Sequence, residues 1–351
     1  MTRTSSQQDG SPVLLIPYMW IGDFVRCHSV VRVLRERFPG RPVDVLTTTL
    51  CKPMLDYMPG VRKGIEWNLP RKKLPFGQYQ ALADALRAEN YGSVLVMPRT
   101  WKSALAPYLA GIPERTGFFG EARVPLLNDV RWGEKALPRM IDRCGMLALP
   151  KDAAMPDKWP EPQLEVPAAE AARWRNARGL PNDGKPVVAL APGAVGPSKR
   201  WPVESFAELA RALTGAGMNV WVLGSPAEQP LAAAIAGRAG AGAHDLTSDD
   251  LRNALFALKL ADAAVSNDSG LVHVAAAIGT PTVGIFGPTS PWHWAPLNPL
   301  AAVIETQTDV PCRPCHQPQC AMVHHRCMRD IPASRVADAV RRALAAVPAD
   351  A

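Results

Sequence analysis

Short apolar runs alternate with amphipathic segments along the first 150 residues. The apolar runs are dominated by Val, Leu and Ile, which predicts buried strands. The segments between them carry apolar residues at helical spacing and end at glycine or proline. Alternating strands and helices indicate a parallel sheet covered by helices. We predict strands at 13–16, 43–46 and 93–97, and helices at 24–38 and 104–110.

The alternation stops in a polar, proline-rich stretch at about 150–170 and then starts again. Such a stretch is typical of a linker. We therefore predict an α/β protein with two doubly wound domains, 1–165 and 166–351, and a cleft between them. A final helix at 335–346 is a candidate to pack back on the N-terminal domain. The other elements predicted after the linker are strands at 187–191, 220–223, 263–265 and 282–286, and helices at 203–214, 249–260 and 271–278.

Composition indicates a soluble globular protein, with 47% hydrophobic and 20% charged residues. No apolar run is long enough to span a membrane, and the N-terminus lacks the apolar core of a secretory signal. We therefore expect a cytoplasmic protein. The net charge is +7, and most of the excess lies in the N-terminal half, including Arg71, Lys72 and Lys73. This predicts either an anionic partner or a solvated basic face. No recognition motif for nucleic acid accompanies the charge, so we expect no nucleic acid partner.

The stretch SNDSGLVHVAAAIG, from Ser266, joins a predicted strand to a predicted helix. The first amide groups of a helix have no partner within the helix, and they suit a diphosphate. Gly270 allows a ligand to approach the backbone, and Asp268 or Ser269 is placed to cap the helix. His273, one turn later, is placed to face the same ligand. The alternative is that Asp268 is only a cap and His273 only a core residue.

Two further loops follow predicted strands in the same half. Gly193, Ala194 and Lys199 lie in PGAVGPSKRWP, where glycines and a lysine near a helix start suit phosphate oxygens. The spacing is not that of a P-loop, and no GxGxxG motif is present. Glu228, in the next loop, is either a partner for ribose hydroxyls or a surface glutamate. Together the loops predict a nucleotide-diphosphate site.

In the N-terminal half, Asp23 lies between the first strand and the first helix. A carboxylate there is a candidate general base for a hydroxyl group, or an ordinary helix cap.

Four cysteines cluster near the C-terminus in the pattern C-x2-C-x4-C-x6-C: Cys312, Cys315, Cys320 and Cys327. Four thiolates can hold a structural zinc ion. Reduced thiols and a disulfide are the alternatives, and cytoplasmic proteins favour the former.

Several long stretches resemble the bacterial lipopolysaccharide heptosyltransferases of glycosyltransferase family 9. They are WIGD at 20–23, 101–131, PGAVGPSKRWP at 192–202 and SNDSGLVHVAAA with GPTSP within 266–291. The resemblance implies a GT-B fold, in which two Rossmann-like domains face a central cleft. It also implies an inverting heptose transfer that needs no cofactor, with the ADP-heptose donor bound by the C-terminal domain.

By motif, the resemblance implies roles for individual residues. Asp23 would be the catalytic base, Lys199 would lie near the donor phosphates, and Glu228 would meet the adenosine. The donor phosphate and sugar loop would contain Asp268, Ser269, Gly270 and His273.

The implied acceptor is heptosyl-Kdo2-lipid A at the inner leaflet, bound by the N-terminal domain, which makes the protein peripheral to the membrane. Lys102 and Arg123 lie inside a matching stretch and Arg99 just before it, so we expect these three to contact the acceptor. Two alternatives remain: a related GT-B enzyme with another sugar or acceptor, such as heptosyltransferase I or III, and a non-catalytic nucleotide-sugar-binding protein.

Overall fold

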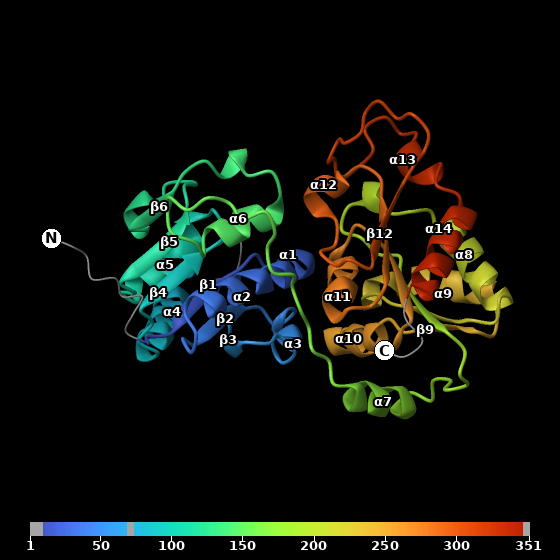
Figure 1. The fold of residues 1–351 in the computed structure, drawn as a ribbon, viewed down its shortest axis with the longest axis horizontal. Helices are drawn as coiled ribbons and strands as arrows, with labels where there is room; N and C mark the ends of the chain where they lie inside the picture. The colour runs from blue at the N-terminus through green and yellow to red at the C-terminus, as the bar shows by residue number, and fades with distance from the viewer. Residues whose placement is uncertain (1–9, 69–73, 347–351) are drawn as a thin grey trace. The chain divides into compact units, whose positions relative to one another are not determined.

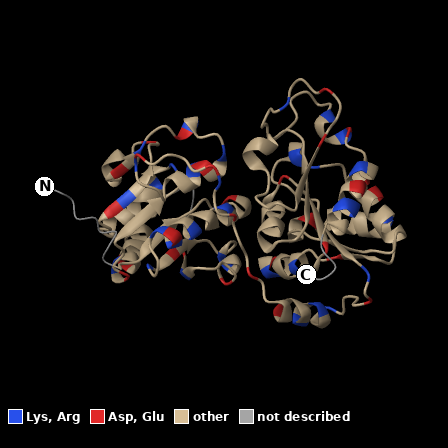
Figure 2. Ribbon diagram, viewed as in Figure 1, with Lys and Arg blue, Asp and Glu red and all other residues tan. Residues whose placement is uncertain are grey.

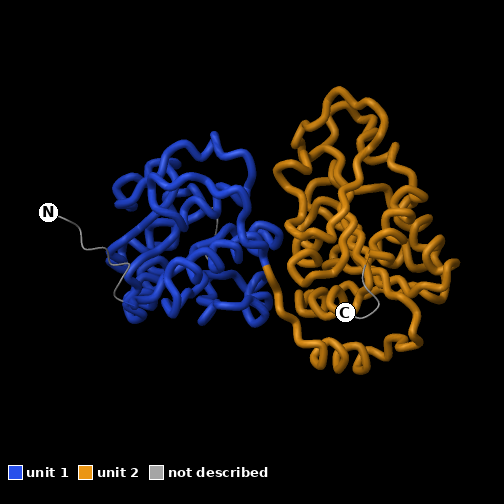
Figure 3. Tube along the Cα trace, viewed as in Figure 1, with its two compact units in different colours: residues 1–162 blue, residues 163–351 orange. Residues whose placement is uncertain are grey.

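The chain forms two compact units, at 1–162 and 163–351 (Figure 3). The structure is a computed structural model, and it describes residues 10–68 and 74–346. Each unit is built on its own six-stranded parallel sheet with helices packed against it (Figure 1). The division falls at Pro162, within the linker that the sequence predicts and three residues before the predicted domain boundary.

The sheet of the first unit has the strand order β3-β2-β1-β4-β5-β6. The central strands are buried along their whole length, whereas the edge strand β3 is mostly exposed. The strands are β1 (Val13–Ile16), β2 (Val43–Thr47), β3 (Val61–Glu66), β4 (Ser93–Val96), β5 (Glu114–Phe118) and β6 (Asp129–Arg131). The helices are α1 (Ile21–Arg26), α2 (His28–Arg37), α3 (Lys52–Leu55), α4 (Phe76–Ala88), α5 (Trp101–Leu109) and α6 (Met140–Met146).

The prediction of one continuous helix at 24–38 is wrong, because α1 and α2 are separate. The backbone tightens at Cys27, whose amide bonds Phe24 O at 3.1 Å and whose carbonyl accepts from Val30 N at 3.0 Å. Both bonds span three residues, which is the tighter 3₁₀ pattern. The short helix α1 therefore holds Asp23 immediately after β1.

The second unit repeats the topology, with the order β12-β11-β10-β7-β8-β9. Its strands are β7 (Val187–Ala191), β8 (Asn219–Val222), β9 (Ala243–Asp245), β10 (Ala263–Asn267), β11 (Thr282–Phe286) and β12 (Ala301–Glu305). Its helices are α7 (Ala168–Ala177), α8 (Val203–Gly215), α9 (Gln229–Ala239), α10 (Leu251–Leu260), α11 (Gly270–Ile278), α12 (Pro291–Trp294), α13 (Arg326–Arg329) and α14 (Ala333–Ala345).

The final helix, α14, belongs to the core of the second unit. Val336 and Val340 are fully buried there with Val265 of β10 and Val283 of β11. The sequence left open that this helix packs back on the N-terminal domain. Its apolar face covers the sheet of its own unit.

Both sheets share the strand order of the Rossmann fold, 3-2-1-4-5-6 when the strands are numbered within each unit. In each sheet the direction of winding reverses between the first and fourth strands. These are β1 and β4 in the first unit, and β7 and β10 in the second. Ligands of such sheets bind where the loops diverge beyond the carboxyl ends of these two strands.

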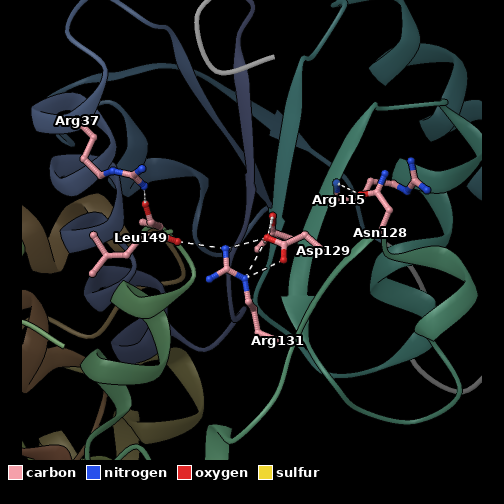
Figure 4. Close-up of polar contacts among 8 residues, drawn as sticks. Arg37, Arg115, Asn128, Asp129, Arg131 and Leu149 are labelled. Carbon is pink, nitrogen blue, oxygen red and sulfur yellow. Dashed lines mark hydrogen bonds and ion pairs between the residues drawn. The ribbon is translucent and has the colours of Figure 1, made fainter. Parts of the chain in front are cut away.

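The edge strand β6 is fixed by side-chain contacts that Figure 4 shows. Arg131 Nη2 lies 2.8 Å from Asp129 Oδ2 and donates to Leu149 O at 3.1 Å. Arg37, from α2, donates to the neighbouring carbonyl of Ala148. These contacts join β6 and α2 to the segment that follows α6.

Carboxylates pair with several basic residues of the first unit, and Figure 2 shows both signs interspersed over its elements. Lys52 pairs with Glu66, and Arg62 with the buried Asp44. Such pairing reduces the charge available to an anionic partner. The basic stretch at 71–73 lies outside the described residues. Among the helices that the structure describes, none is long and apolar enough to cross a membrane.

Candidate active site

The loops after β7 and β10 meet through an ion pair between Lys199 and Asp268. Lys199 Nζ lies 2.7 Å from Asp268 Oδ2, and the carboxylate is almost fully buried. The same oxygen accepts a hydrogen bond from Thr289 Oγ1 at 2.7 Å. Because β7 and β10 are neighbours in the sheet, this pair lies at the switch point of the second unit. It places an ammonium group where ligands of this fold bind.

Asn267, the last residue of β10, holds both ends of the Lys199 loop. Its Nδ2 donates to Pro192 O at 2.6 Å, and its Oδ1 accepts from Trp201 N at 3.1 Å. The side chain is completely buried. The amide of Asn267 therefore fixes the loop on which Lys199 is carried.

The prediction that Asp268 or Ser269 caps α11 is wrong. No side-chain hydrogen bond caps this helix within the described part of the chain. The Asp268 carboxylate is instead turned to Lys199 and Thr289, and Ser269 Oγ lies 3.1 Å from Ser266 Oγ. The helix begins at Gly270, and His273 is buried one turn later.

Glu228 lies directly beside Gly193. A Cβ atom on Gly193 would lie 1.6 Å from Glu228 Oε1, so a larger residue there would force the Glu228 side chain to move. The other carboxylate oxygen accepts hydrogen bonds from Ser225 N at 2.8 Å and Ser225 Oγ at 3.0 Å. The neighbouring Ala194 is buried, and its carbonyl accepts from Arg200 Nε at 2.9 Å. The loops after β7 and β8 are thus in contact, as a single nucleotide site requires.

A segment near the C-terminus, residues 312–328, holds the Lys199 loop from the other side. Ser198 makes three bonds to it: its amide donates to Pro318 O at 3.2 Å, its hydroxyl to Gln317 O at 2.5 Å, and its carbonyl lies 2.7 Å from His325 Nε2. The amide of Cys315 also donates to Pro288 O at 3.0 Å, beside Thr289. We call residues 312–328 the C-terminal clamp, because it binds both loops that contact Asp268.

The four clustered cysteines lie in this clamp, and none of them forms a disulfide in the described chain. Cys327 is buried, and burial raises the pKa of its thiol to about 11. Cys312 Sγ lies 3.9 Å from His324 Nε2. Within residues 10–68 and 74–346, no group of three or more His, Cys, Asp or Glu side chains has an arrangement that could hold a metal ion.

In the first unit, Asp23 lies in the first turn of α1, at the carboxyl end of β1. Its Oδ1 is 2.9 Å from Nη1 of Arg26, whose side chain is almost fully buried. Tyr18, from the same loop, is held protonated because burial raises its pKa far above the ordinary value, with the Asp23 charge contributing in the same direction. A carboxylate paired with a buried guanidinium is held in one orientation.

Arg123 does not lie on the surface, so the prediction that it contacts an acceptor fails in this structure. Its side chain is fully buried, Nε donates to Phe118 O at 2.9 Å, and the guanidinium also donates to Pro98 O. Burial lowers the pKa of Arg123 to about 10. We reassign this residue to holding the loop after β4 against the end of β5.

The other two acceptor candidates lie at the carboxyl edge of the first sheet. Arg99 follows β4 and is half-exposed, with Nε 2.9 Å from Glu134 Oε2. Lys102 lies in the first turn of α5 and is half-buried. Both remain accessible for an anionic ligand.

Residues 79–325 match the profile of Glycosyltransferase family 9 (heptosyltransferase). The lipopolysaccharide heptosyltransferase 2 of Escherichia coli (strain K12) is 37% identical over 310 residues, covering 84% of this chain and 88% of that protein. The Salmonella typhimurium protein of the same name is 35% identical over 338 residues, covering 92% and 96%. A solved structure of E. coli ADP-heptose lps heptosyltransferase II superposes with a TM-score of 0.83 at 33% identity, covering 95% and 98%.

Two Rossmann-like units and these structural similarities define an α/β protein of the GT-B class. The chain belongs to glycosyltransferase family 9, and it is a glycosyltransferase. The resemblance inferred from its motifs is therefore confirmed.

Proposed function

We propose that this protein is an inverting glycosyltransferase that moves L-glycero-D-manno-heptose from ADP-heptose to the first heptose of heptosyl-Kdo2-lipid A. The observation that carries the proposal is the Lys199–Asp268 ion pair at the switch point of the second sheet. The relatives support the choice of sugar and acceptor, because two proteins named lipopolysaccharide heptosyltransferase 2 match most of the chain. The solved relative is described as an ADP-heptose enzyme.

The second unit, in this proposal, binds ADP-heptose. The diphosphate meets Lys199 Nζ and the first amides of α11, which begins at Gly270 without a side-chain cap. Glu228 accepts hydrogen bonds from the ribose, beside Gly193. His273, one turn into α11, is assigned to the side of the donor that carries the sugar. Ala194 and Ser269 lie in the same two loops, and they are assigned to contacts between their backbone and the donor.

The first unit binds the acceptor and supplies the base. Asp23 removes the proton from the O3 hydroxyl of the acceptor heptose while that oxygen attacks the anomeric carbon. The bond from this carbon to ADP breaks, and the anomeric configuration inverts. The ion pair with Arg26 orients the carboxylate that accepts this proton. Arg99 and Lys102 are assigned to anionic groups of the acceptor.

Negative charge builds on ADP as the bond breaks. The Lys199 ammonium and the α11 amides stabilise that charge, and a well-placed donor of this kind typically contributes about 3–4 kcal/mol to the transition state. We therefore propose that catalysis needs no metal ion. Treatment with a chelator followed by gel filtration tests this: activity that is unchanged supports it, and activity restored only by a divalent cation contradicts it.

The zinc ion suggested by the cysteine spacing is a separate, structural proposal. Cys312, Cys315, Cys320 and Cys327 would be its ligands. Metal analysis of the purified protein decides it. About one equivalent of zinc supports the site, and less than about a tenth of an equivalent contradicts it.

We propose a cytoplasmic enzyme that works at the periphery of the inner membrane, because the acceptor is anchored in the inner leaflet. Binding to vesicles that contain the acceptor, lost at high salt, would support this location.

The decisive experiment is transfer with purified protein, ADP-heptose and heptosyl-Kdo2-lipid A, followed by mass spectrometry. The expected product is heavier by one heptose, and Asp23→Asn should lower turnover by roughly 10²–10⁴-fold. Transfer from a different nucleotide sugar, or to a different acceptor, would favour a related GT-B enzyme. Tight ADP-heptose binding without any transfer would favour a nucleotide-sugar-binding protein.

A further inference from the structure

An exposed pair of stacked aromatic rings lies at the carboxyl edge of the first sheet. Phe119 and Trp132 have ring centroids 4.3 Å apart and planes inclined by only 16°. Trp132 is 64% exposed and Phe119 41% exposed. We call these two residues the aromatic platform. Large exposed aromatic groups on a folded surface commonly mark a binding site.

The platform is built to be rigid. Phe119 follows β5 and Trp132 follows β6, and Phe119 N donates to Arg131 O at 2.7 Å. The side chain of Arg131 is itself fixed to Asp129 and to Leu149 O (Figure 4). Stacking on Phe119 holds the indole of Trp132 in one orientation. Binding of a ligand to the outer face of the indole therefore costs little conformational entropy, because the ring is already ordered.

Three loops pack together around the platform. Arg99, after β4, pairs with Glu134, after β6, at 2.9 Å. Gly120, after β5, passes so close to Arg99 that a Cβ on it would lie 2.7 Å from Arg99 O. The half-exposed guanidinium of Arg99 is thus held close to the aromatic platform, because β4 is the neighbour of β5. Aromatic surface and positive charge are adjacent in a fixed arrangement.

The aromatic platform lies at the same edge of the first sheet as the proposed base, Asp23. All four strands concerned are parallel, in the order β1-β4-β5-β6, so the residues after them share one edge of the sheet. Asp23 follows β1, Arg99 follows β4, and Trp132 follows β6. Strands are spaced by about 4.8 Å, so the platform lies roughly 14 Å along the edge from β1. That span is longer than one sugar ring.

We propose that the aromatic platform binds a sugar ring of the acceptor saccharide, one or two residues away from the ring that carries the reacting hydroxyl. This inference rests on the proposed function. A pyranose ring presents an apolar C–H face, which suits the flat face of an indole. The neighbouring Arg99 favours a sugar that carries a carboxylate or phosphate.

The test is steady-state transfer by Trp132→Ala with two acceptors, one with its acyl chains in detergent micelles and one chemically deacylated. We expect the KM for both acceptors to rise about 5- to 10-fold, the range for loss of one aromatic contact. The effect should lie in KM rather than kcat, because the platform is remote from the reacting atoms. Trp132→Phe, which keeps a flat ring, should recover most of the loss.

Met155→Ala is the matched control, because Met155 is also an exposed hydrophobic residue of the first unit. It should leave both KM values unchanged. Thermal unfolding of each variant checks that Trp132→Ala remains folded.

An unchanged KM for the deacylated acceptor in Trp132→Ala would overturn the proposal. A KM that rises only with the acylated acceptor would overturn it too, and would assign the rings to the lipid surface. If the wild-type protein transfers heptose to neither acceptor, the proposed function itself fails. That result is distinguishable from a failure of the platform alone.

Discussion

The carboxylate of Glu228 occupies the space that a Cβ atom on Gly193 would need, since that atom would lie 1.6 Å from Glu228 Oε1. The two loops, from adjacent strands, make this contact because one of them carries a glycine here, and a side chain at this point would displace the carboxylate. The contact joins the loop of Lys199 to the residue assigned to the ribose.

Gly193→Ala should therefore displace Glu228 and weaken the binding of ADP. We expect the Kd for ADP, measured by calorimetry, to rise at least about tenfold, since steric overlap at this distance forces the carboxylate to move. Gly196→Ala is the control, because its Cβ would meet the nearest atom at 3.4 Å, an ordinary contact. Equal Kd values for the two variants would contradict the close approach.

Lys199→Met removes the ammonium group and keeps most of the side-chain volume. We expect kcat to fall about 10²–10³-fold, the usual cost of losing one donor to a developing anion. Lys185→Met is the control, because Lys185 also pairs with a carboxylate but is exposed. Rapid-quench measurement of heptose transfer separates the chemical step from product release.

Removing Lys199 also leaves the buried Asp268 with Thr289 as a partner. We expect the double variant Lys199→Met, Asp268→Asn to unfold at a higher temperature than Lys199→Met alone, because no unpaired charge remains buried. Its activity should stay low. A double variant with restored activity would remove Lys199 from catalysis.

The C-terminal clamp predicts an effect specific to the donor. His325→Ala removes the bond to Ser198 O, one residue from Lys199. We expect the KM for ADP-heptose to rise about 3- to 10-fold while the KM for the acceptor is unchanged, because loss of one hydrogen bond loosens this loop only. Faster amide exchange at 196–200 would accompany it. His324→Ala is the control, since its ring bonds Arg326 N instead.

Stability should fall between pH 6.5 and 4 because of His28. Burial lowers its pKa from 6.5 to about 4, and its Nε2 lies 2.8 Å from Pro59 O. In this range the unfolded chain binds a proton that the folded chain does not, so stability is greatest above pH 6.5 and decreases as the pH falls toward 4. The full difference corresponds to about 3 kcal/mol in the free energy of unfolding.

Urea unfolding of the wild type and His28→Gln at pH 4.5 and 7.0 checks this prediction. The loss between the two pH values should be smaller in His28→Gln by roughly 2–3 kcal/mol. His324→Gln is the control, because this histidine lies in the second unit and does not contact Pro59. An equal loss in the wild type and His28→Gln would show that His28 is not buried in its neutral form.

The sequence predicts the central strands well and the edge strands poorly. β1, β7 and β11 are buried on both faces, so they appear as apolar runs. The edge strand β3 reads VRKGIE and is largely exposed, and β9 is only Ala243–Asp245. Such strands lack a hydrophobic pattern because they face solvent. They can be identified only in the structure, where they pair with a neighbouring strand.

The residues of the candidate site also divide into those that the sequence predicts and those that it does not. Lys199 and Asp268 could be found because each follows a buried strand. The roles of Asn267, Thr289 and Ser198 could not, since they depend on partners that only the folded chain brings near. Asn267 stood within the motif, but its burial between Pro192 and Trp201 leaves no local signal. Arg123 was misassigned because an arginine in a loop is normally exposed, and nothing local indicates that carbonyl groups enclose it.

The clamp has a consequence for how the protein is made. Ser198 is joined to Gln317 and His325, which follow it by 119 and 127 residues along the chain. A ribosome that has already released β7 and β10 must still translate the clamp before the Lys199 loop acquires these bonds. The nascent polypeptide therefore contains β7 to β11 before it contains any of the clamp, and the Lys199 loop acquires these bonds only after residue 325 has been translated.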